Sequence, residues 1–334
     1  MNDIAMEAGV SVATVSKVLN GSDRVSLETR SRVQDLLSQR NYERRPAART
    51  GPAPIVDLVL REVSNPWAIE IIAGAVEAAR RAHATVAVNA LPDNGEHGSW
   101  IDDICARGTR GVIVLLARLS ERENAALRSR GIPLAVIDPR GEPDPKVPTV
   151  GATNWSGAYA ATRHLTELGH QRIAIISGPR DLFCSRARMD GYRSAMEEAG
   201  LPIDPELMRW GDFHVEAAFK HATEMLSMDD RPTAIFAGSD LQAMGVLEAA
   251  RLARMQVPGQ LSLVGFDDIP LSRWMSPPLT SVRQPLAEMA GTAVRLVLSH
   301  GDGNSKEDRS LELATSLVVR ESTGVPPRTV RRTS

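Results

Sequence analysis

From Ile55 onward, the sequence alternates short apolar runs with longer amphipathic stretches, and this rhythm limits the folds that the chain can adopt. The apolar runs expected to form strands are 55–60, 86–88, 112–116, 134–137, 173–176, 234–236 and 261–264. Between them, helical spacing of apolar residues predicts helices that include 69–81, 158–168, 189–199 and 241–254. Continuously apolar strands that alternate with helices predict parallel sheets with helices on both faces. About 280 residues of this pattern predict two doubly wound parallel-sheet lobes.

The first 50 residues have a different pattern, that of short helices. Gly9 follows a helical stretch at 3–8, and Ser11 and Ser26 are candidates to cap the next two helices. Apolar residues at helical spacing then predict a small all-α bundle. These residues are Val12, Val15, Val18 and Leu19 in the second helix, and Val33, Leu36 and Leu37 in the third.

The segment 44–54 has the sequence RRPAARTGPAP, which predicts a linker between the bundle and the α/β part. Residues 1–50 contain eight Lys and Arg against six Asp and Glu, whereas the whole chain has a net charge of −2. A basic segment on a nearly neutral protein favours nucleic acid as a partner. A solvated linker is the alternative explanation of the same charge.

The two predicted helices around Gly9 fit a helix-turn-helix arrangement. Gly9 permits the sharp turn, while Val10 and Val15 hold the two helices together. The second helix would then expose Val12, Ala13, Ser16 and Lys17, as a helix that enters the DNA major groove does. An ordinary helical hairpin with a capped second helix explains the spacing equally well.

The segment DIAMEAGVSVATVSKVLNGSDRVSLETRSRVQDLLSQRNY resembles the DNA-binding headpiece of the LacI/GalR family over its whole length. The resemblance implies that the recognition helix begins near Ser11 and that Val12, Ala13 and Lys17 contact bases. It places Thr14, Ser16 and Asn20 near phosphates, where contacts set register and make binding depend on salt.

The predicted linker departs from the family's hinge. Gly51 stands where the family usually has a leucine that wedges into the minor groove, and Pro46 lies within the expected hinge helix. An apolar wedge is therefore not expected here. The hypothesis is instead that Arg44, Arg45 and Arg49 bind a narrow minor groove electrostatically.

The rest of the chain resembles the periplasmic-binding-protein-like (type I) core of the same family, through LTELGHQRIAIISGP, SRARMDGYRSAM, PTAIFAGSDLQAMGVL, LSLVGFDDIP and SPPLTSVRQP. The resemblance implies that Arg188 and Asp267 bracket sugar hydroxyls, with Asp138 as a further polar group. It also places three aromatic residues and one serine, which replaces a common Asn, at the pocket: Trp67, Phe213, Trp274 and Ser239. A structural ion pair for Arg188 and Asp267, and core positions for Phe213 and Trp67, are the alternatives.

These observations predict a headpiece at 1–43, a hinge at 44–54 and an effector-binding and dimerisation core at 55–334. Within the core, one lobe (the N-lobe) should comprise about 55–152 and 283–309, and the other (the C-lobe) about 153–282 and 310–325.

The predicted function is a cytoplasmic homodimeric repressor of sugar-utilisation genes that binds a pseudo-palindromic DNA operator. A small saccharide between the lobes would control it. No catalytic residue, metal, cofactor or membrane partner is expected: the sequence contains no GxGxxG, Walker A, HExxH or GxSxG motif, and Cys105 and Cys184 form no CxxC pair. A stand-alone sugar-binding protein with a degenerate headpiece is the alternative, and an enzyme is a weaker one.

Overall fold

The computed structural model describes residues 2–19, 25–39, 53–91, 99–141, 144–299 and 310–327. It divides into two compact units, Met1–Ala53 and Pro54–Ser334. Each unit has its own hydrophobic core.

In its described part, the first unit contains three helices: α1 (Asn2–Glu7), α2 (Val12–Leu19) and α3 (Leu27–Gln39). Gly9 has a positive φ of 65°, which lets the chain turn sharply between α1 and α2. Val15, Val33 and Leu37 are buried together with residues of α1, and Val10 and Leu36 pack against them. The predicted bundle is confirmed, with Val15, Val18, Val33 and Leu37 in its core, whereas Val12 is exposed and the side chain of Leu19 lies outside the described residues.

In its described residues, the second unit contains two six-stranded sheets, one in each lobe. The N-lobe sheet has the order β11-β5-β4-β3-β1-β2, and all of its pairings are parallel. Its strands are β1 (Ile55–Leu60), β2 (Thr85–Ala90), β3 (Thr109–Leu115), β4 (Leu134–Ile137), β5 (Thr149–Ala152) and β11 (Ser310–Leu313).

The C-lobe sheet has the order β12-β10-β9-β8-β6-β7 and is parallel except for the pairing of β10 with β12. Its strands are β6 (Ile173–Ser177), β7 (Met208–Trp210), β8 (Ala234–Ala237), β9 (Ser262–Asp267), β10 (Thr280–Arg283) and β12 (Ser316–Val318). The prediction of two doubly wound lobes is confirmed.

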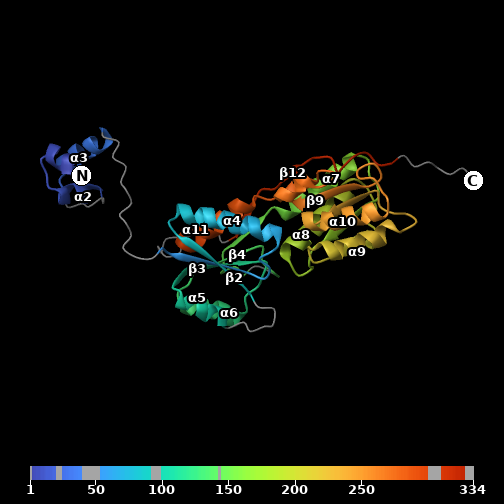
Figure 1. The fold of residues 1–334 in the computed structure, drawn as a ribbon, viewed down its shortest axis with the longest axis horizontal. Helices are drawn as coiled ribbons and strands as arrows, with labels where there is room; N and C mark the ends of the chain where they lie inside the picture. Colours follow the sequence, from blue (N-terminus) through green and yellow to red (C-terminus); the bar gives the residue numbers. More distant parts are fainter. Residues whose placement is uncertain are drawn as a thin grey trace, which may run out of the picture. The chain divides into compact units, whose positions relative to one another are not determined.

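Helices cover both faces of the N-lobe sheet (Figure 1). Val56 and Leu58 of β1 pack with α4 (Pro66–Arg81) and α11 (Leu286–Ser299), whereas Val59 packs with α5 (Ser99–Ala106) and α6 (Glu121–Ser129). Successive side chains of a strand point to opposite faces, so a strand between two helical layers must be apolar throughout. This requirement explains the continuous apolar runs.

The C-lobe is layered in the same way. The helices α7 (Asn154–Glu167) and α8 (Phe183–Glu198) pack side by side, as do α9 (Val215–Leu226) and α10 (Asp240–Leu252) (Figure 1). Two short 3-10 turns complete the lobe, η1 (Pro205–Leu207) and η2 (Pro270–Trp274).

The chain crosses between the lobes after β5, after β10 and after β11, and two of these crossings are bonded to each other. The Thr153 amide donates to the Leu313 carbonyl at 2.9 Å, and the Thr315 amide donates to Thr153 Oγ1 at 2.9 Å. The crossings after β5 and after β11 are therefore held together by hydrogen bonds.

The predicted lobe boundaries differ from the structure at two places. Residues 310–313, expected in the C-lobe, form β11, which pairs with β5 at the edge of the N-lobe sheet. The prediction also began the second N-lobe segment at residue 283, but Arg283 is the last residue of β10 in the C-lobe. The four residues of β11 alternate between exposed and half-buried, a pattern that is compatible with an edge of either sheet.

Candidate functional site

A cavity lies between the lobes, where strands of both sheets end. Open α/β folds bind ligands at the carboxyl ends of their strands. The lining residues from the N-lobe are Asn65, Trp67, Leu116 and Asp138. Those from the C-lobe are Cys184, Arg188, Phe213, Ser239, Leu241, Asp267 and Ile269.

Six of the seven residues predicted to bind effector line this cavity; Trp274 does not. Trp274 is 84% exposed, because it lies on the outer side of η2. A 3-10 helix has about three residues per turn, so the buried Ser272 and Met275 share one side of the turn, and Leu271 and Trp274 share the other.

Arg188 is buried, and its guanidinium is fixed by several contacts. Its Nε donates to Asn154 Oδ1 at 2.9 Å, its Nη1 donates to the Gly238 carbonyl, and the Phe266 ring centroid lies 3.8 Å from Cζ. Its Nη1 is 3.9 Å from Asp267 Oδ1, which is too far for a hydrogen bond. The two charged groups therefore face each other without closing into a bonded pair.

Asp138 and Asp267 are both buried at strand ends. Burial raises the pKa of Asp138 to about 6 and the pKa of Asp267 to about 7, although the charge of Arg188 partly opposes both shifts. Gln284 Nε2 donates to Asp267 Oδ1 at 2.6 Å and orients that carboxyl group. The cavity thus presents two carboxyl groups that change charge near neutral pH.

Four lining residues have a positive φ although none is glycine: Leu116, Asp138, Phe213 and Asp267, with φ of 48°, 48°, 68° and 113°. Such conformations cost about 1–3 kcal/mol each and cluster at binding sites. The ring of Phe213 lies so close to Gly178 that a Cβ there would be 2.1 Å from it. The backbone is therefore shaped to direct these side chains at the cavity.

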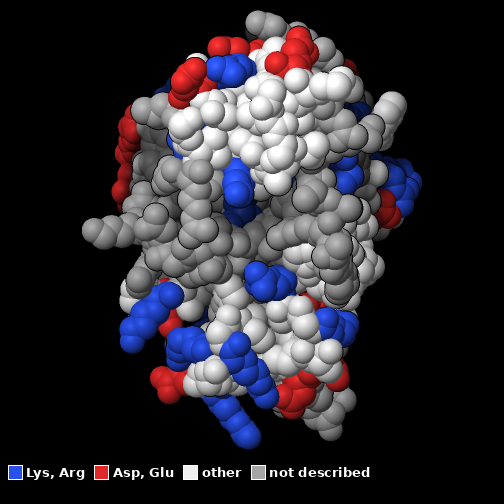
Figure 2. Space-filling view, turned by 90° about the vertical axis from the view of Figure 1, so that its left-hand side faces the viewer, with Lys and Arg blue, Asp and Glu red and all other residues white. Residues whose placement is uncertain are grey.

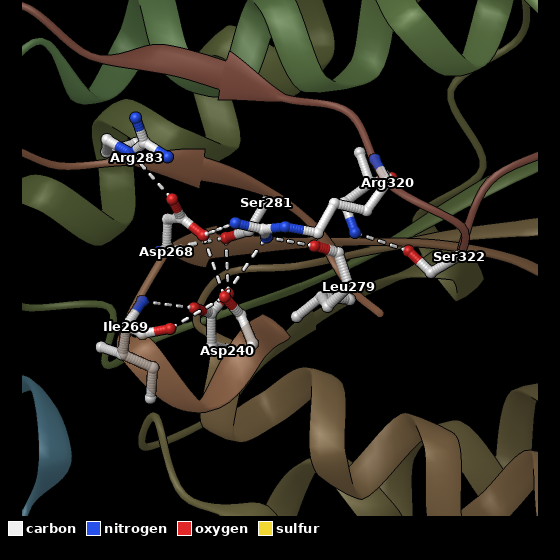
Figure 3. Close-up of polar contacts among 10 residues, drawn as sticks. Asp240, Asp268, Ile269, Leu279, Ser281, Arg283, Arg320 and Ser322 are labelled. Carbon is white, nitrogen blue, oxygen red and sulfur yellow. Dashed lines mark hydrogen bonds and ion pairs between the residues drawn. The ribbon is translucent and has the colours of Figure 1, made fainter. Parts of the chain in front are cut away.

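A polar network behind the cavity holds the loop that carries Asp267 and Ile269 (Figure 3). Asp268 Oδ2 accepts from Arg283 Nε at 2.7 Å, and Asp268 Oδ1 accepts from Arg320 Nη2 at 2.5 Å. Asp240 Oδ2 accepts from the Ile269 amide at 2.9 Å. Asp267 and Asp268 are adjacent in sequence, yet one lines the cavity and the other is bound by arginines.

Sequence reasoning missed five lining residues: Asn65, Leu116, Cys184, Leu241 and Ile269. Leu116 directly follows β3, so its place at a strand end was a usable signal. Cys184 is buried, and this burial raises the pKa of its thiol to about 12. A protonated thiol with such a pKa acts as a small apolar wall of the cavity.

The first unit presents a separate candidate surface on α2. Ser11 Oγ accepts from the Thr14 amide at 3.2 Å and so caps the helix, and Ser26 Oγ accepts from the Thr29 amide at 3.3 Å in the same way. Val12, Ala13 and Lys17 are exposed, as a helix that reads DNA requires.

Several predicted DNA-binding positions lie outside the described residues: Asn20, Arg44, Arg45, Arg49 and the side chain of Ser16. Figure 2 shows described Lys and Arg side chains at the surface, several of them gathered in the lower part of the view with Asp and Glu side chains beside them.

The described part of the chain contains no group of three or more His, Cys, Asp or Glu side chains that could hold a metal ion. Nor does it contain a helix long and apolar enough to cross a membrane.

Comparisons with known proteins agree with both units. Residues 1–45 match the family model of bacterial regulatory proteins of the lacI family, and residues 162–323 match that of the periplasmic binding protein-like domain. The HTH-type transcriptional repressor CytR of Escherichia coli (strain K12) is 32% identical over 331 residues, which cover 98% of this chain and 97% of CytR.

Two solved structures are similar over nearly the whole chain. The transcriptional regulator CelR in complex with cellobiose has a TM-score of 0.74 and 31% identity, over 96% of this chain and 98% of that one. The lac repressor dimer bound to operator and the anti-inducer ONPF has a TM-score of 0.71 and 26% identity, over the same shares. This chain therefore belongs to the lacI family of bacterial regulatory proteins.

Proposed function

We propose that this protein is a cytoplasmic transcriptional repressor of sugar-utilisation genes, controlled by a small saccharide bound between its lobes. The observation that carries the proposal is the cavity in which a fixed guanidinium faces two carboxyl groups beside aromatic rings. The family relationship supports the regulatory part, because the relative CytR is a repressor.

The chemistry of the cavity suits a sugar. Adjacent hydroxyls can accept from the Arg188 guanidinium and donate to the Asp267 and Asp138 carboxylates, which fixes their directions. Trp67 and Phe213 offer aromatic faces to the apolar C–H faces of a pyranose ring. Ser239 supplies a further hydroxyl, although it also caps α10 by accepting from the Gln242 amide.

On the DNA side, we propose that Val12, Ala13 and Lys17 contact bases in the major groove. Thr14, Ser16 and Asn20, with the cap residue Ser11, would lie near phosphates. Arg44, Arg45 and Arg49 would add electrostatic contacts in the minor groove.

Two copies would pair through their cores, so that two headpieces meet a pseudo-palindromic operator. A saccharide that closes the lobes about their hinge would change how the headpieces are presented to DNA. Sites coupled in this way typically exchange about 1–3 kcal/mol, and the coupling is reciprocal.

The test is fluorescence anisotropy of a labelled DNA fragment from the gene's own upstream region, with and without a panel of sugars. We expect tight, salt-sensitive binding that one sugar shifts and that Lys17→Ala weakens. Lys220→Ala is the matched control, because Lys220 is an exposed lysine on α9. Sugar binding without specific DNA binding would favour the alternative, a stand-alone sugar-binding protein with a degenerate headpiece.

A further inference from the structure

A second cavity adjoins the first. The two cavities share four lining residues: Asn65, Trp67, Leu116 and Phe213. We call them the inner and the outer cavity. They therefore meet at these four side chains.

The walls of the outer cavity come from both lobes and carry both charges. Between the lobes, His214 Nε2 lies 3.5 Å from Glu62 Oε2, and Arg140 Nη1 lies 2.7 Å from Asp181 Oδ2. The outer cavity is therefore bordered by the Arg140–Asp181 ion pair, by the side chains of His214 and Glu62, and by apolar residues such as Leu60 and Leu182.

One N–H group in this wall, on Arg140, lacks a hydrogen-bond acceptor. The Nε of Arg140 is buried and has no hydrogen-bond partner among the described residues. A buried N–H without an acceptor is costly, and in native structures it usually faces water or a ligand. A ligand oxygen within reach of the Arg140 Nε would supply the acceptor.

The junction between the cavities is aromatic and rigid. Trp67 is held at the start of α4, where its amide donates to Asn65 Oδ1 at 3.0 Å. Phe213 is held by its positive φ and by the close approach of its ring to Gly178. Two aromatic side chains that border both cavities suit a ligand whose two units each have a partly apolar face.

We propose that the outer cavity is a second sugar subsite and that the effector is a disaccharide. The proposal rests on the proposed function of the inner cavity as a saccharide site. One ring occupies the inner cavity, the glycosidic link passes Trp67 and Phe213, and the second ring lies in the outer cavity. Hydroxyls both donate and accept, so they match a wall with Arg61 and Arg140 as donors and Asp212 and Glu62 as acceptors.

The experiment is isothermal titration calorimetry of the full chain with matched pairs of sugars: xylose and xylobiose, glucose and cellobiose, glucose and maltose, and galactose and lactose. For one pair, we expect the disaccharide to bind at least about tenfold more tightly than its monosaccharide, as one or two added hydrogen bonds would give. Equal affinities within every pair would overturn the subsite and leave the saccharide proposal intact. Binding of no sugar would overturn both.

Two variants test whether the outer cavity provides the higher affinity for the disaccharide. Arg61 is exposed and lines the outer cavity but not the inner one, so Arg61→Ala should remove about tenfold of the disaccharide affinity and leave the monosaccharide affinity unchanged. Arg118→Ala is the control, because Arg118 is an exposed arginine of the same lobe that lines neither cavity. A disaccharide advantage that survives Arg61→Ala unchanged would contradict the assignment.

Discussion

The two lobes share an architecture but differ in how they hydrogen-bond a buried carboxylate. In the N-lobe, the buried Asp57 accepts from Arg107 and Asn89 through one oxygen, while its Oδ2 has no partner among the described residues. In the C-lobe, Asp268 uses both oxygens in a network with Arg283 and Arg320. The C-lobe thus builds a fixed polar wall for the cavity, whereas the N-lobe contributes mainly the walls around Trp67. The difference indicates that the C-lobe sets more of the geometry of the site than the N-lobe does.

The largest effect is expected from breaking the C-lobe network. Asp268→Ala should lower the free energy of unfolding by about 3–5 kcal/mol, because it leaves the mostly buried Arg320 without its carboxylate. Asp57→Ala should cost only about 1–2 kcal/mol, since Arg107 is 40% exposed and can turn to water. Urea denaturation measures both values. Equal losses would contradict the difference drawn between the lobes.

The next largest effect is expected on effector affinity, in variants that lose a contact with the ligand. Arg188→Met should weaken binding of the effector about a hundredfold, because a fixed, buried, charged donor is lost. Asp138→Asn in the N-lobe should weaken it about tenfold, since the amide keeps the shape and one acceptor. Calorimetry with the best sugar gives both affinities. A larger loss for Asp138→Asn would assign the geometry of the ligand to the N-lobe instead.

A smaller effect is expected from pH. Asp267 has its pKa raised to about 7 and Asp138 to about 6, so both are protonated in acid and lose acceptor capacity there. Effector affinity should therefore rise with pH. Below pH 7, it should change by about tenfold per pH unit for each carboxyl group that must release a proton on binding. The unliganded protein should show the opposite trend in stability, since a raised carboxyl pKa favours the folded state at low pH.

The matched control for this pH dependence is Asp138→Asn, which should flatten the affinity profile below about pH 6 while leaving the change near pH 7. An affinity that is constant from pH 5 to 8 would show that the effector makes no use of the ionised carboxylates.

The smallest effect concerns His170, a buried C-lobe residue away from the cavity. Its Nε2 donates to the Gly324 carbonyl at 2.9 Å, and its Nδ1 lies 2.8 Å from Thr233 Oγ1. Burial lowers the pKa of His170 below its usual 6.5, so its contribution to stability is present above that value and lost as the pH falls. The protection of backbone amides around Ser262 and Gly324 against hydrogen exchange, relative to their intrinsic rates, should therefore fall in acid, and His170→Gln should lack that dependence.

Much of this fold was predictable because buried parallel strands must be apolar on both faces. The bounds of β1 and β4 were predicted to the residue. The strands β5, β7, β10, β11 and β12 were not predicted, because they have three or four residues each and several carry polar or charged side chains. Their strand conformation depends on the neighbouring strands that they pair with, which local sequence does not specify.

The candidate site was predicted mainly through family resemblance. It identified Arg188, Asp267 and Phe213, all of which line the cavity. It failed for Trp274, because a 3-10 turn decides which side that residue faces. The outer cavity was not foreseen at all, since residues far apart in the sequence, such as Arg61, Arg140 and Asp212, meet only after both lobes have folded together.

The placement of β11 and β12 has a consequence for how the protein is made. These two strands lie only three residues apart in the chain, yet each is an edge strand of a different sheet. During synthesis, both sheets therefore lack an edge until the ribosome has released residue 318. A nascent chain halted before residue 310 would leave one edge of β5 and one edge of β10 unpaired at once. Completion of the two sheets is thus a single late event, and a chain cut short before residue 310 lacks an edge strand in both lobes.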